Sequence, residues 1–214
     1  MARIQAFAKA PVAGQVKTRL LPAIDGDAAA LLHRRLVLHT LRTACDAAPG
    51  RVELHCSPST DHPFFAECAA RHDLALVQQF EGDIGARMAH ALRAAAPSSP
   101  LLLIGTDCPA RTVGDLLTAI AALDSGCDAV LGPVEDGGYS LIGLSRFEAR
   151  LFHDIAWSTD QVLAQTLVRL RHYDFRVHML PELWDVDRPD DLRRLQSTHP
   201  SLLDGIDHHA CLPG

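Results

Sequence analysis

Short apolar runs alternate along the chain with longer segments in which apolar positions recur every three or four residues. The short runs, which predict strands, cover residues 4–8, 51–56, 74–77, 101–105, 129–131, 139–144 and 175–180. The longer segments, which predict helices, cover residues 27–47, 63–71, 83–96, 112–124 and 161–172. A last helix is expected to open at residues 187–190, with an acidic N-cap and an early proline. This alternation predicts an α/β protein.

The most apolar of the strand-length runs is LLLIG at residues 101–105. We expect it at the centre of the sheet, because a strand that is covered on both faces is apolar throughout. No internal repeat is visible, and a chain of 214 residues fits one domain, which we place over residues 1–198. Residues 199–214 carry little periodicity and predict a C-terminal tail, either packed on the surface or frayed.

The composition is that of a globular protein with enough apolar surface for a core. Hydrophobic residues make up 48% of the chain, charged residues 21%, and the mean hydropathy is +0.06. A formal charge of −6 gives no positive surface for nucleic-acid phosphates, so no nucleic-acid partner is expected. No apolar run has the length of a membrane span or a signal peptide, so we expect a cytoplasmic protein without a membrane partner. Nothing in the pattern specifies an oligomeric state.

Six cysteines lie at positions 45, 56, 68, 108, 127 and 211, and none belongs to a C-x-x-C pair. They are expected to be reduced and mostly buried thiols. Cys108 is no exception, because no histidine lies near it in the sequence to activate it as a nucleophile. His208, His209 and Cys211 form a short terminal cluster, but its spacing matches no standard zinc ligand set.

Ligands of open α/β sheets bind beyond the carboxyl ends of the strands, so the segment after each strand is a candidate site. The loop after the first strand reads KAPVAGQVKTR. Gly14 lets its backbone approach a ligand, Thr18 adds a hydroxyl donor, and Lys9, Lys17 and Arg19 bring three positive charges. A nucleotide phosphate is the expected occupant, and a solvated basic loop is the alternative. The spacing is neither that of a P-loop nor G-x-G-x-x-G.

Carboxylates near two other strand ends predict a metal site. Asp107 follows the strand at 101–105 directly and is the first candidate ligand for Mg²⁺ or Mn²⁺, while the neighbouring Thr106 is expected to contact the nucleotide. The alternative role of Asp107 is to cap the next helix. In the segment WDVD, Asp185 and Asp187 lie two apart and would point the same way on an extended chain, so Asp187 is expected to complete the metal site or to serve as an N-cap.

The segment GPVEDGGY at residues 132–139 predicts a catalytic or acceptor-binding loop. Its paired glycines, Gly137 and Gly138, permit positive φ angles and a close approach to a ligand. Glu135 and Asp136 bring carboxylates to the same edge of the sheet, and Tyr139 follows them. We expect Glu135, Gly137, Gly138 and Tyr139 to contact the acceptor. A plain tight turn is the alternative, because D-G and G-G are common in hairpins.

Two weaker signals accompany these loops. The segment GDIGARM at the start of a predicted helix contains Gly82, Asp83 and Arg87, which would bind base, ribose or an anion near the helix amides. Trp157 precedes another predicted helix. It would line an acceptor pocket or, as the sequence favours, occupy a core position.

Four motifs in this order resemble one known family. They are FAKAPVAGQVKTRL, GDIGARM, IGTDCP with GPVEDGGYSLIGL, and WDVDRPDDL. The family consists of bacterial GT-A-fold proteins long labelled as a domain of unknown function (DUF2064), described as glycosyltransferase-like and linked to arsenosugar biosynthesis. The resemblance covers about residues 3–195. The first loop is also similar to the KSRL stretch of 2-phospho-lactate guanylyltransferases, and the general plan resembles molybdenum-cofactor guanylyltransferases.

The resemblance implies a three-layer α/β/α, Rossmann-like GT-A fold with a mostly parallel central sheet. It places nucleotide phosphates on Gly14, Lys17 and Arg19, a divalent metal on Asp107, and the nucleoside near residues 82–87. By the same analogy, Asp136 or Asp187 would help to hold the metal or the acceptor. The sequence departs from related enzymes in two ways: the D-x-D of many glycosyltransferases is TDC here, and the G-G-x-S-x-R-M-G loop of sugar nucleotidyltransferases is absent.

These observations predict a metal-dependent transferase that uses a nucleotide-activated donor, with glycosyl transfer from a nucleotide-diphospho-sugar to a small acceptor as the first hypothesis. Lys17 and Arg19 would stabilise the charge that develops on the diphosphate, and Asp136 or Glu135 would deprotonate the acceptor. The alternative is a guanylyltransferase-like nucleotidyltransferase that joins NMP from an NTP to a small phosphorylated acceptor and releases pyrophosphate. A non-catalytic nucleotide-binding protein is the hypothesis from another class.

Overall fold

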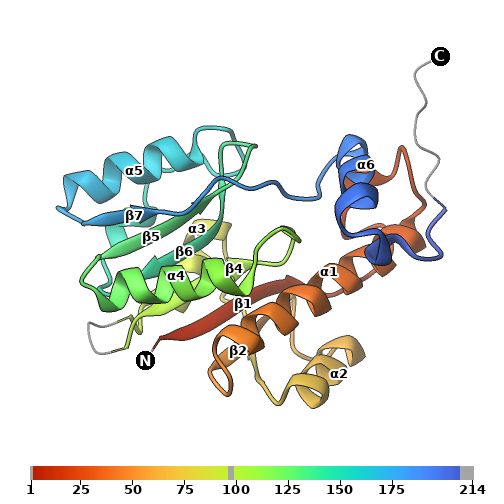
Figure 1. The fold of residues 1–214 in the computed structure, drawn as a ribbon, viewed down its shortest axis with the longest axis horizontal. Helices are drawn as coiled ribbons and strands as arrows, with labels where there is room; N and C mark the ends of the chain where they lie inside the picture. Colours follow the sequence, from red (N-terminus) through yellow and green to blue (C-terminus); the bar gives the residue numbers. More distant parts are fainter. Residues whose placement is uncertain (1, 96–98, 208–214) are drawn as a thin grey trace.

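The computed structural model describes residues 2–95 and 99–207 and contains one seven-stranded sheet in the order β3-β2-β1-β4-β6-β5-β7 (Figure 1). Its strands are β1 Arg3–Lys9, β2 Val52–Ser57, β3 Ala75–Gln78, β4 Leu101–Gly105, β5 Ala129–Pro133, β6 Tyr139–Leu144 and β7 Val177–Met179. Neighbouring strands pair in parallel, except that β6 is antiparallel to both β4 and β5. The mostly parallel sheet and the central position of β4 are therefore confirmed.

Six α-helices connect and flank the strands: α1 Gly26–Ala47, α2 Pro63–His72, α3 Ile84–Leu92, α4 Val113–Asp124, α5 Val162–His172 and α6 Pro189–Thr198. Short 3-10 helices cover Thr18–Leu20, Ala149–Phe152 and Pro200–Leu203. Helix α3 ends at Leu92, before the expected residue 96, because Ala95 turns back onto Leu92 and is buried in the core. The alanine-rich sequence there favours a helix locally, but burial of Ala95 ends it.

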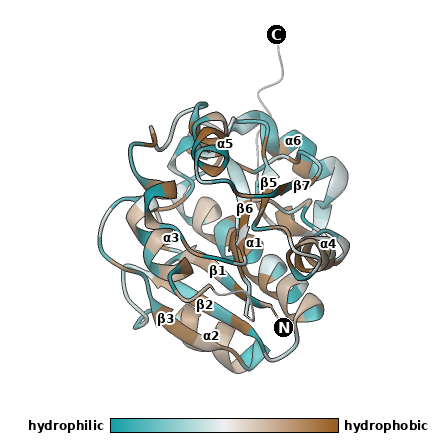
Figure 2. Cartoon of the chain, turned by 90° about the vertical axis from the view of Figure 1, so that its left-hand side faces the viewer, coloured by the Kyte–Doolittle hydropathy of each residue, from teal (hydrophilic) through white to brown (hydrophobic). Residues whose placement is uncertain are grey.

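Alternating side chains along the strands give the sheet two apolar faces. On β1, Ile4, Ala6 and Ala8 pack under α1, α2 and α4, whereas Phe7 packs under α3 on the opposite face. Figure 2 shows α3 and α4 on opposite sides of the strands. The period-two alternation of strand side chains thus produces the predicted three-layer α/β/α arrangement.

The start of α6 differs from the prediction of an acidic N-cap. The N-cap is Arg188, and Asp187 lies outside the helix. The capping carboxylate comes instead from Asp191 at the third helical position, which accepts hydrogen bonds from the backbone amides of Asp187 and Arg188. Pro189 occupies the first helical position, as expected.

A third apolar cluster lies beyond the end of the sheet. Leu32 and Leu36 of α1 pack there with Trp184, Leu195 of α6 and residues 202–206. Residues 200–206 of the predicted C-terminal tail are therefore packed on the protein surface, and Figure 1 shows α6 beside one end of α1. The remainder of the tail, with His208, His209 and Cys211, lies outside the described residues.

The cysteines of the described part of the chain are free thiols, and Cys56, Cys68 and Cys108 are buried, as expected. Burial raises the pKa of the Cys56 and Cys68 thiols to about 12, so both are inert. Within residues 2–95 and 99–207, no helix has the combination of length and apolar character that a membrane crossing requires.

Candidate functional site

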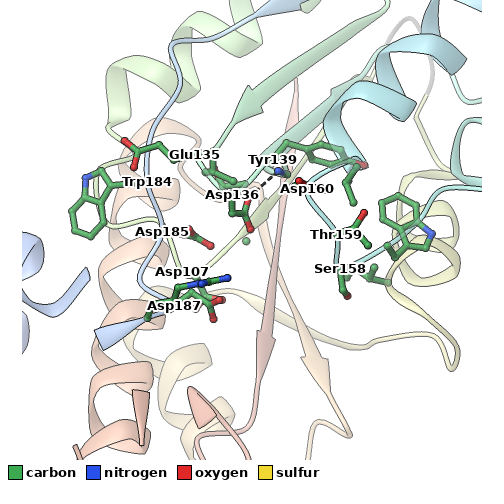
Figure 3. A pocket seen from close by; sticks show the side chains of 18 of the residues that line it. Asp107, Glu135, Asp136, Tyr139, Ser158, Thr159, Asp160, Trp184, Asp185 and Asp187 are labelled. Atoms are coloured by element: carbon green, nitrogen blue, oxygen red, sulfur yellow. Dashed lines mark hydrogen bonds between the residues drawn. The ribbon is translucent and has the colours of Figure 1, made fainter. Parts of the chain in front are cut away.

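A cleft of about 940 Å³ opens at the edge of the sheet where β4 and β5 end and β6 begins (Figure 3). Gly105 and Asp107 line it after β4, Glu135 and Asp136 line it after β5, and Tyr139 lines it at the start of β6. Ligand sites of open α/β sheets lie at this edge. The structure thus brings the segments GTDCP and GPVEDGGY to one cleft.

Lys17 and Asp107 form an ion pair at the base of this cleft. The Nζ atom of Lys17 lies 2.6 Å from Oδ1 of Asp107 and donates a hydrogen bond to the carbonyl of Val186, also at 2.6 Å. Only 5% of the Lys17 side chain is exposed, against 49% for Asp107. Burial, the largest single effect, acts to raise the pKa of Asp107, but the interactions with Lys17 and the charge of His33 together outweigh it and lower the pKa overall. Asp107 therefore presents an ionised carboxylate to the cleft.

The predicted alternation in WDVD is confirmed. Val186 is fully buried in the third apolar cluster, while Asp185 and Asp187 both line the cleft. Burial and the charges of Asp136 and Asp107 raise the pKa of Asp185 to about 6. Among the described residues, the Asp185 carboxylate has no hydrogen-bond or ion-pair partner. It is thus a largely desolvated carboxylate near other carboxylates, whose charges the nearby Lys17 offsets only in part.

Arg19 brings a positive charge to the same end of the cleft. Its Nη1 donates to Oδ2 of Asp187 at 2.5 Å, and this hydrogen bond and the charge of Asp187 raise the pKa of Arg19. More than half of the Arg19 side chain remains exposed, so its other donors can reach a bound anion. The first loop and the WDVD segment, 168 residues apart, therefore meet here.

This carboxylate-rich end fits a divalent cation that is shared with a ligand. No group of three or more His, Cys, Asp or Glu side chains in the described ranges is arranged to enclose a metal ion. However, Mg²⁺ in proteins is commonly held by one or two carboxylates, with phosphate oxygens and water completing the shell. The unpartnered Asp185 and the exposed part of Asp107 suit this role. Asp187, the second ligand expected from the sequence, is engaged by Arg19.

The carboxylates of Asp136 and Glu135 differ in how many of their oxygens accept hydrogen bonds from the protein. One oxygen of Asp136 accepts a hydrogen bond from the amide of Gly138 at 2.8 Å, and Figure 3 places the side chain in the middle of the cleft. Both oxygens of Glu135 accept hydrogen bonds from Nη1 of Arg194, at 2.9 and 2.8 Å. Figure 3 shows Glu135 beside Trp184. Asp136 therefore keeps one carboxylate oxygen without a hydrogen bond in the described part of the chain, whereas Glu135 has both oxygens engaged.

Gly137, the first of the paired glycines, packs against the segment that forms a second wall of the cleft. Gly137 has a φ of +85°, and a Cβ atom there would lie 2.2 Å from the carbonyl oxygen of Asp160. Its own carbonyl accepts a hydrogen bond from the amide of Leu163 at 2.9 Å. The segment at residues 157–160, called the 157–160 loop below, is thereby fixed against the turn. Gly137 serves this packing, so the turn is more than a hairpin connection.

Trp157 of this loop combines the two roles weighed from the sequence. It lines the cleft and also packs against the apolar layer under α3 and α5. Its indole lies on Gly85, where a Cβ atom would be 2.3 Å from Nε1. Tyr139 lines the cleft beside it, with its hydroxyl buried, and burial raises the pKa of that hydroxyl. Nothing in the sequence indicated that Gly85, the second glycine of GDIGARM, accommodates Trp157.

Thr106, one of the predicted nucleotide contacts, has a buried side chain, and its contact with a nucleotide stays a prediction. Its hydroxyl donates to the carbonyl of Phe7 at 3.3 Å. The hydroxyl therefore links β4 to β1. Successive side chains of an extended segment point in opposite directions, so Thr106 points into the protein interior while Asp107 points into the cleft.

The other predicted nucleotide contacts lie near the same sheet edge but, apart from Arg19, do not line the cleft. Lys9 donates to the carbonyl of Gln15 at 2.9 Å, and Arg87 donates to that of Gly82 at 2.8 Å. Gly14 has a φ of +74° and open space around its Cα, Thr18 begins a 3-10 helix, and Asp83 is the N-cap of α3. Their contact with a nucleotide stays a prediction.

Gln79 connects the two predicted nucleotide-binding segments, and the sequence did not single it out. Its side-chain amide donates to the carbonyls of Ala8 and His55, at 3.3 and 2.8 Å. Its side-chain oxygen lies 3.5 Å from Nη1 of Arg87. The loop before α3 is thus held beside the ends of β1 and β2, next to the basic first loop.

The sheet order, the three layers and the position of the cleft define the fold of nucleotide-diphospho-sugar transferases and nucleotidyltransferases, and hence a transferase-like protein. Residues 40–159 match the family described as uncharacterized proteins conserved in bacteria (DUF2064), and the chain belongs to that family. The family resemblance expected from the motifs is confirmed. A comparison with curated protein sequences gives no match.

Solved structures support the same fold. A protein from Desulfovibrio desulfuricans G20, which carries the provisional name of a nucleotide-diphospho-sugar transferase, is 29% identical, with a TM-score of 0.80 over 96% of this chain and 91% of its own. A CMP:2-keto-3-deoxy-manno-octonic acid synthetase complexed with CTP is 12% identical, with a TM-score of 0.58 over 94% and 98%. A cytidylyltransferase from Leptospira borgpetersenii is 11% identical, with a TM-score of 0.55 over 95% and 97%. At such low identity, the last two show the fold alone.

Proposed function

We propose that this protein is a metal-dependent transferase that moves a glycosyl group from a nucleotide-diphospho-sugar to a small acceptor. The observation that carries the proposal is the group of carboxylates, Asp107, Asp136 and Asp185, gathered with Arg19 in one cleft at the carboxyl edge of the sheet. One or two carboxylates at a phosphate-binding cleft are the usual protein ligands of Mg²⁺, and Asp185 has no cationic partner among the described residues while Asp107 is half exposed beside Lys17. The provisional name of the relative from Desulfovibrio desulfuricans G20 agrees with this proposal.

The donor end of the cleft is the end that carries Asp107, Asp185 and Arg19. Asp107 and Asp185 would hold Mg²⁺ or Mn²⁺, which when bound neutralises the negative charge of a diphosphate. The exposed donors of Arg19 are placed to bind phosphate oxygens as the bond to the sugar breaks. Lys17 acts from behind, because its ammonium group keeps Asp107 ionised and fixes its position.

Asp136 takes the role of general base in this proposal. As the acceptor oxygen forms a bond to the anomeric carbon, the acceptor proton moves to the Asp136 carboxylate. The bond between that carbon and the diphosphate oxygen breaks, and the nucleoside diphosphate leaves with the electron pair. The hydrogen bond from Gly138 leaves the second oxygen of Asp136 free to accept the proton.

Product analysis tests this function. With Mg²⁺ or Mn²⁺ present, the protein is incubated in one series with nucleotide-diphospho-sugars and small hydroxylated acceptors, and in a parallel series with NTPs and small phosphorylated acceptors. Released nucleoside diphosphate and pyrophosphate are quantified separately. We expect nucleoside diphosphate from one or more donors. Release of pyrophosphate from an NTP would contradict glycosyl transfer in favour of nucleotidyl transfer. Tight nucleotide binding without consumption of any donor would indicate a non-catalytic nucleotide-binding protein.

A matched pair of variants assigns the reaction to the cleft. Asp136→Asn removes the proposed base and should lower kcat by about a hundredfold, a typical contribution of general-base catalysis, while donor binding is kept. Asp204→Asn makes the same chemical change at an exposed site outside the cleft and should leave kcat unchanged. Equal activity of the two variants would exclude Asp136 as the base.

A further inference from the structure

The cleft has two chemically different ends. The donor end carries Asp107, Asp185 and Arg19. The opposite end, called the acceptor end below, is formed by Tyr139, by the 157–160 loop, and by Ile84 and Met88 of α3. Figure 3 shows Ser158, Thr159 and Asp160 across the cleft from Asp185, with Asp136 between the two ends. An acceptor bound at this end would lie beside the proposed base.

We infer that the acceptor end binds an unphosphorylated sugar or polyol, and that it disfavours phosphate esters. This inference rests on the proposed glycosyl transfer and names the chemical class of its acceptor. It follows from the distribution of charge, from the state of the nearby helix amides, and from the apolar surface of the loop.

Positive charge is confined to the donor end. The cleft-lining cations of the described chain are Arg19 and Arg188, and they lie with Asp187, which Arg19 binds and Arg188 follows in the sequence. The acidic side chains at and beside the acceptor end are Asp160 and the centrally placed Asp136, and carboxylates only accept hydrogen bonds. A phosphate ester placed there would face like charges without a counter-ion, which opposes binding strongly.

The helix amides at this end are partly engaged within the protein. Helices α3 and α5 both begin at this end, and the N-termini of helices are frequent phosphate sites. However, the amide of Ala86 in α3 already donates to Asp83, at 2.8 Å. The amides of Gln161 and Leu163 donate to Thr159 and Gly137, at 3.2 and 2.9 Å. At least one amide at each helix start is therefore engaged by an acceptor of the protein itself, which leaves fewer amides for a phosphate.

The surface that remains suits a hydroxylated ring or chain. Trp157, Tyr139 and Ile84 give an apolar face, and Gly85 holds the indole of Trp157 in place. The hydroxyl of Ser158 and the carboxylate of Asp160 lie beside this face. The hydroxyl can donate to and accept from the hydroxyl groups of a ligand, and the carboxylate can accept from them. An apolar wall with a few oriented polar groups is the usual form of a small-molecule site.

Matched acceptor pairs test the inference. Glucose, mannose and ribose are each compared with the corresponding phosphate monoester, both by calorimetric binding in the presence of Mg²⁺ and nucleoside diphosphate and by kcat/KM with each nucleotide-sugar. We expect the unphosphorylated member to be preferred by at least about tenfold. Asp160→Lys should shift this ratio toward the ester by at least about tenfold. Asp154→Lys carries the same charge change at an exposed acid outside the cleft and should leave the ratio unchanged.

The outcomes separate this inference from the proposed function. A preference for the esters, no binding of any sugar, or a ratio that Asp160→Lys does not move would overturn the inference. Preferential binding of unphosphorylated sugars without consumption of any nucleotide-sugar would contradict the proposed transfer while keeping the acceptor end as assigned. Glycosyl transfer to phosphorylated acceptors in preference to unphosphorylated ones would contradict the inference while supporting the proposed function.

Discussion

The buried ammonium group of Lys17 lies 2.6 Å from Oδ1 of Asp107 and holds this carboxylate at the base of the cleft. The same ammonium group donates to the carbonyl of Val186, between the two acids of the WDVD segment. One side chain of the first loop therefore fixes two segments that each contribute carboxylates to the site. In this arrangement, Lys17 supports the metal-binding residues from behind and has no exposed face toward the cleft.

Replacing Lys17 with methionine should destabilise the protein. The variant keeps the length of the side chain but leaves a buried oxygen of Asp107 and the carbonyl of Val186 without their donor. Loss of one partner of such a pair costs about 1–3 kcal/mol, because Asp107 remains partly solvated. Urea denaturation measures this loss. Lys9→Met is the matched control, since Lys9 is exposed, and it should cost less than about 0.5 kcal/mol. Equal effects of the two substitutions would refute a structural role for Lys17.

Asp185 should make stability depend on pH in the metal-free protein. Its pKa is raised from an ordinary value of 3.8 to about 6 by burial and by neighbouring carboxylates. The protonated form is therefore favoured by folding, and its contribution is complete below about pH 4 and lost as the pH rises through 6. Asp185→Asn, which mimics the protonated form, should match the wild type at pH 4 and exceed its stability at pH 8 by about 1–3 kcal/mol. Denaturation at both pH values, with chelator present, measures the difference.

The control for this prediction is Asp204→Asn at an exposed position. Its stability relative to the wild type should not change between pH 4 and 8. If the difference in the free energy of unfolding between Asp185→Asn and the wild type is also constant over this range, then folding does not raise the pKa of Asp185.

Gly137→Ala should displace the 157–160 loop. The new Cβ atom would lie 2.2 Å from the carbonyl oxygen of Asp160, at a φ of +85° that side chains rarely adopt. Gly50→Ala isolates the backbone strain, because Gly50 has a φ of +69° and no atom within 4 Å of the added Cβ. We expect thermal unfolding to show a loss of about 1 kcal/mol for Gly50→Ala and a clearly larger loss for Gly137→Ala. Equal losses would show that the loop does not rest on Gly137.

Gly85→Ala should move the indole of Trp157, because the added Cβ atom would lie 2.3 Å from Nε1. Gly114→Ala is a matched control, since both glycines are the second residue of a helix and the nearest atom at Gly114 is 3.6 Å away. Alanine should stabilise α4 by about 0.5–1 kcal/mol in the control. In Gly85→Ala this gain should vanish, and the tryptophan fluorescence spectrum should shift. A spectrum identical to that of the wild type would contradict the contact.

The periodicity of the sequence predicted the strands and helices closely, because most of them bury one face against the same sheet. The place of β6 between β4 and β5 could not be predicted, since a six-residue apolar run does not specify its neighbours or its direction. The sequence predicted an acidic N-cap for α6 because Asp187 precedes Pro189 by two residues. In the structure, Asp187 binds Arg19, and this contact depends on the folding of the first loop 168 residues away.

The candidate site, like the fold, could be predicted only in part from the sequence. Rules for strand ends placed Asp107, Asp136 and the WDVD segment at one edge of the sheet, and the structure gathers them there. The burial of Lys17 and the contact of Trp157 with Gly85 were not predictable, because each depends on a close approach between distant segments. Local sequence shows which groups are present, whereas tertiary packing determines which of them remain free to bind a ligand.

Binding of Mn²⁺, followed by electron paramagnetic resonance with and without a nucleoside diphosphate, tests the central claim most directly. The wild type should bind one Mn²⁺ per chain, more tightly when the diphosphate is present. Asp107→Asn and Asp185→Asn should each weaken this binding by at least about tenfold, and Asp204→Asn should not. Failure of the wild type to bind Mn²⁺ even with the diphosphate, or equal affinity in all four proteins, would contradict a metal-dependent transferase site in this cleft.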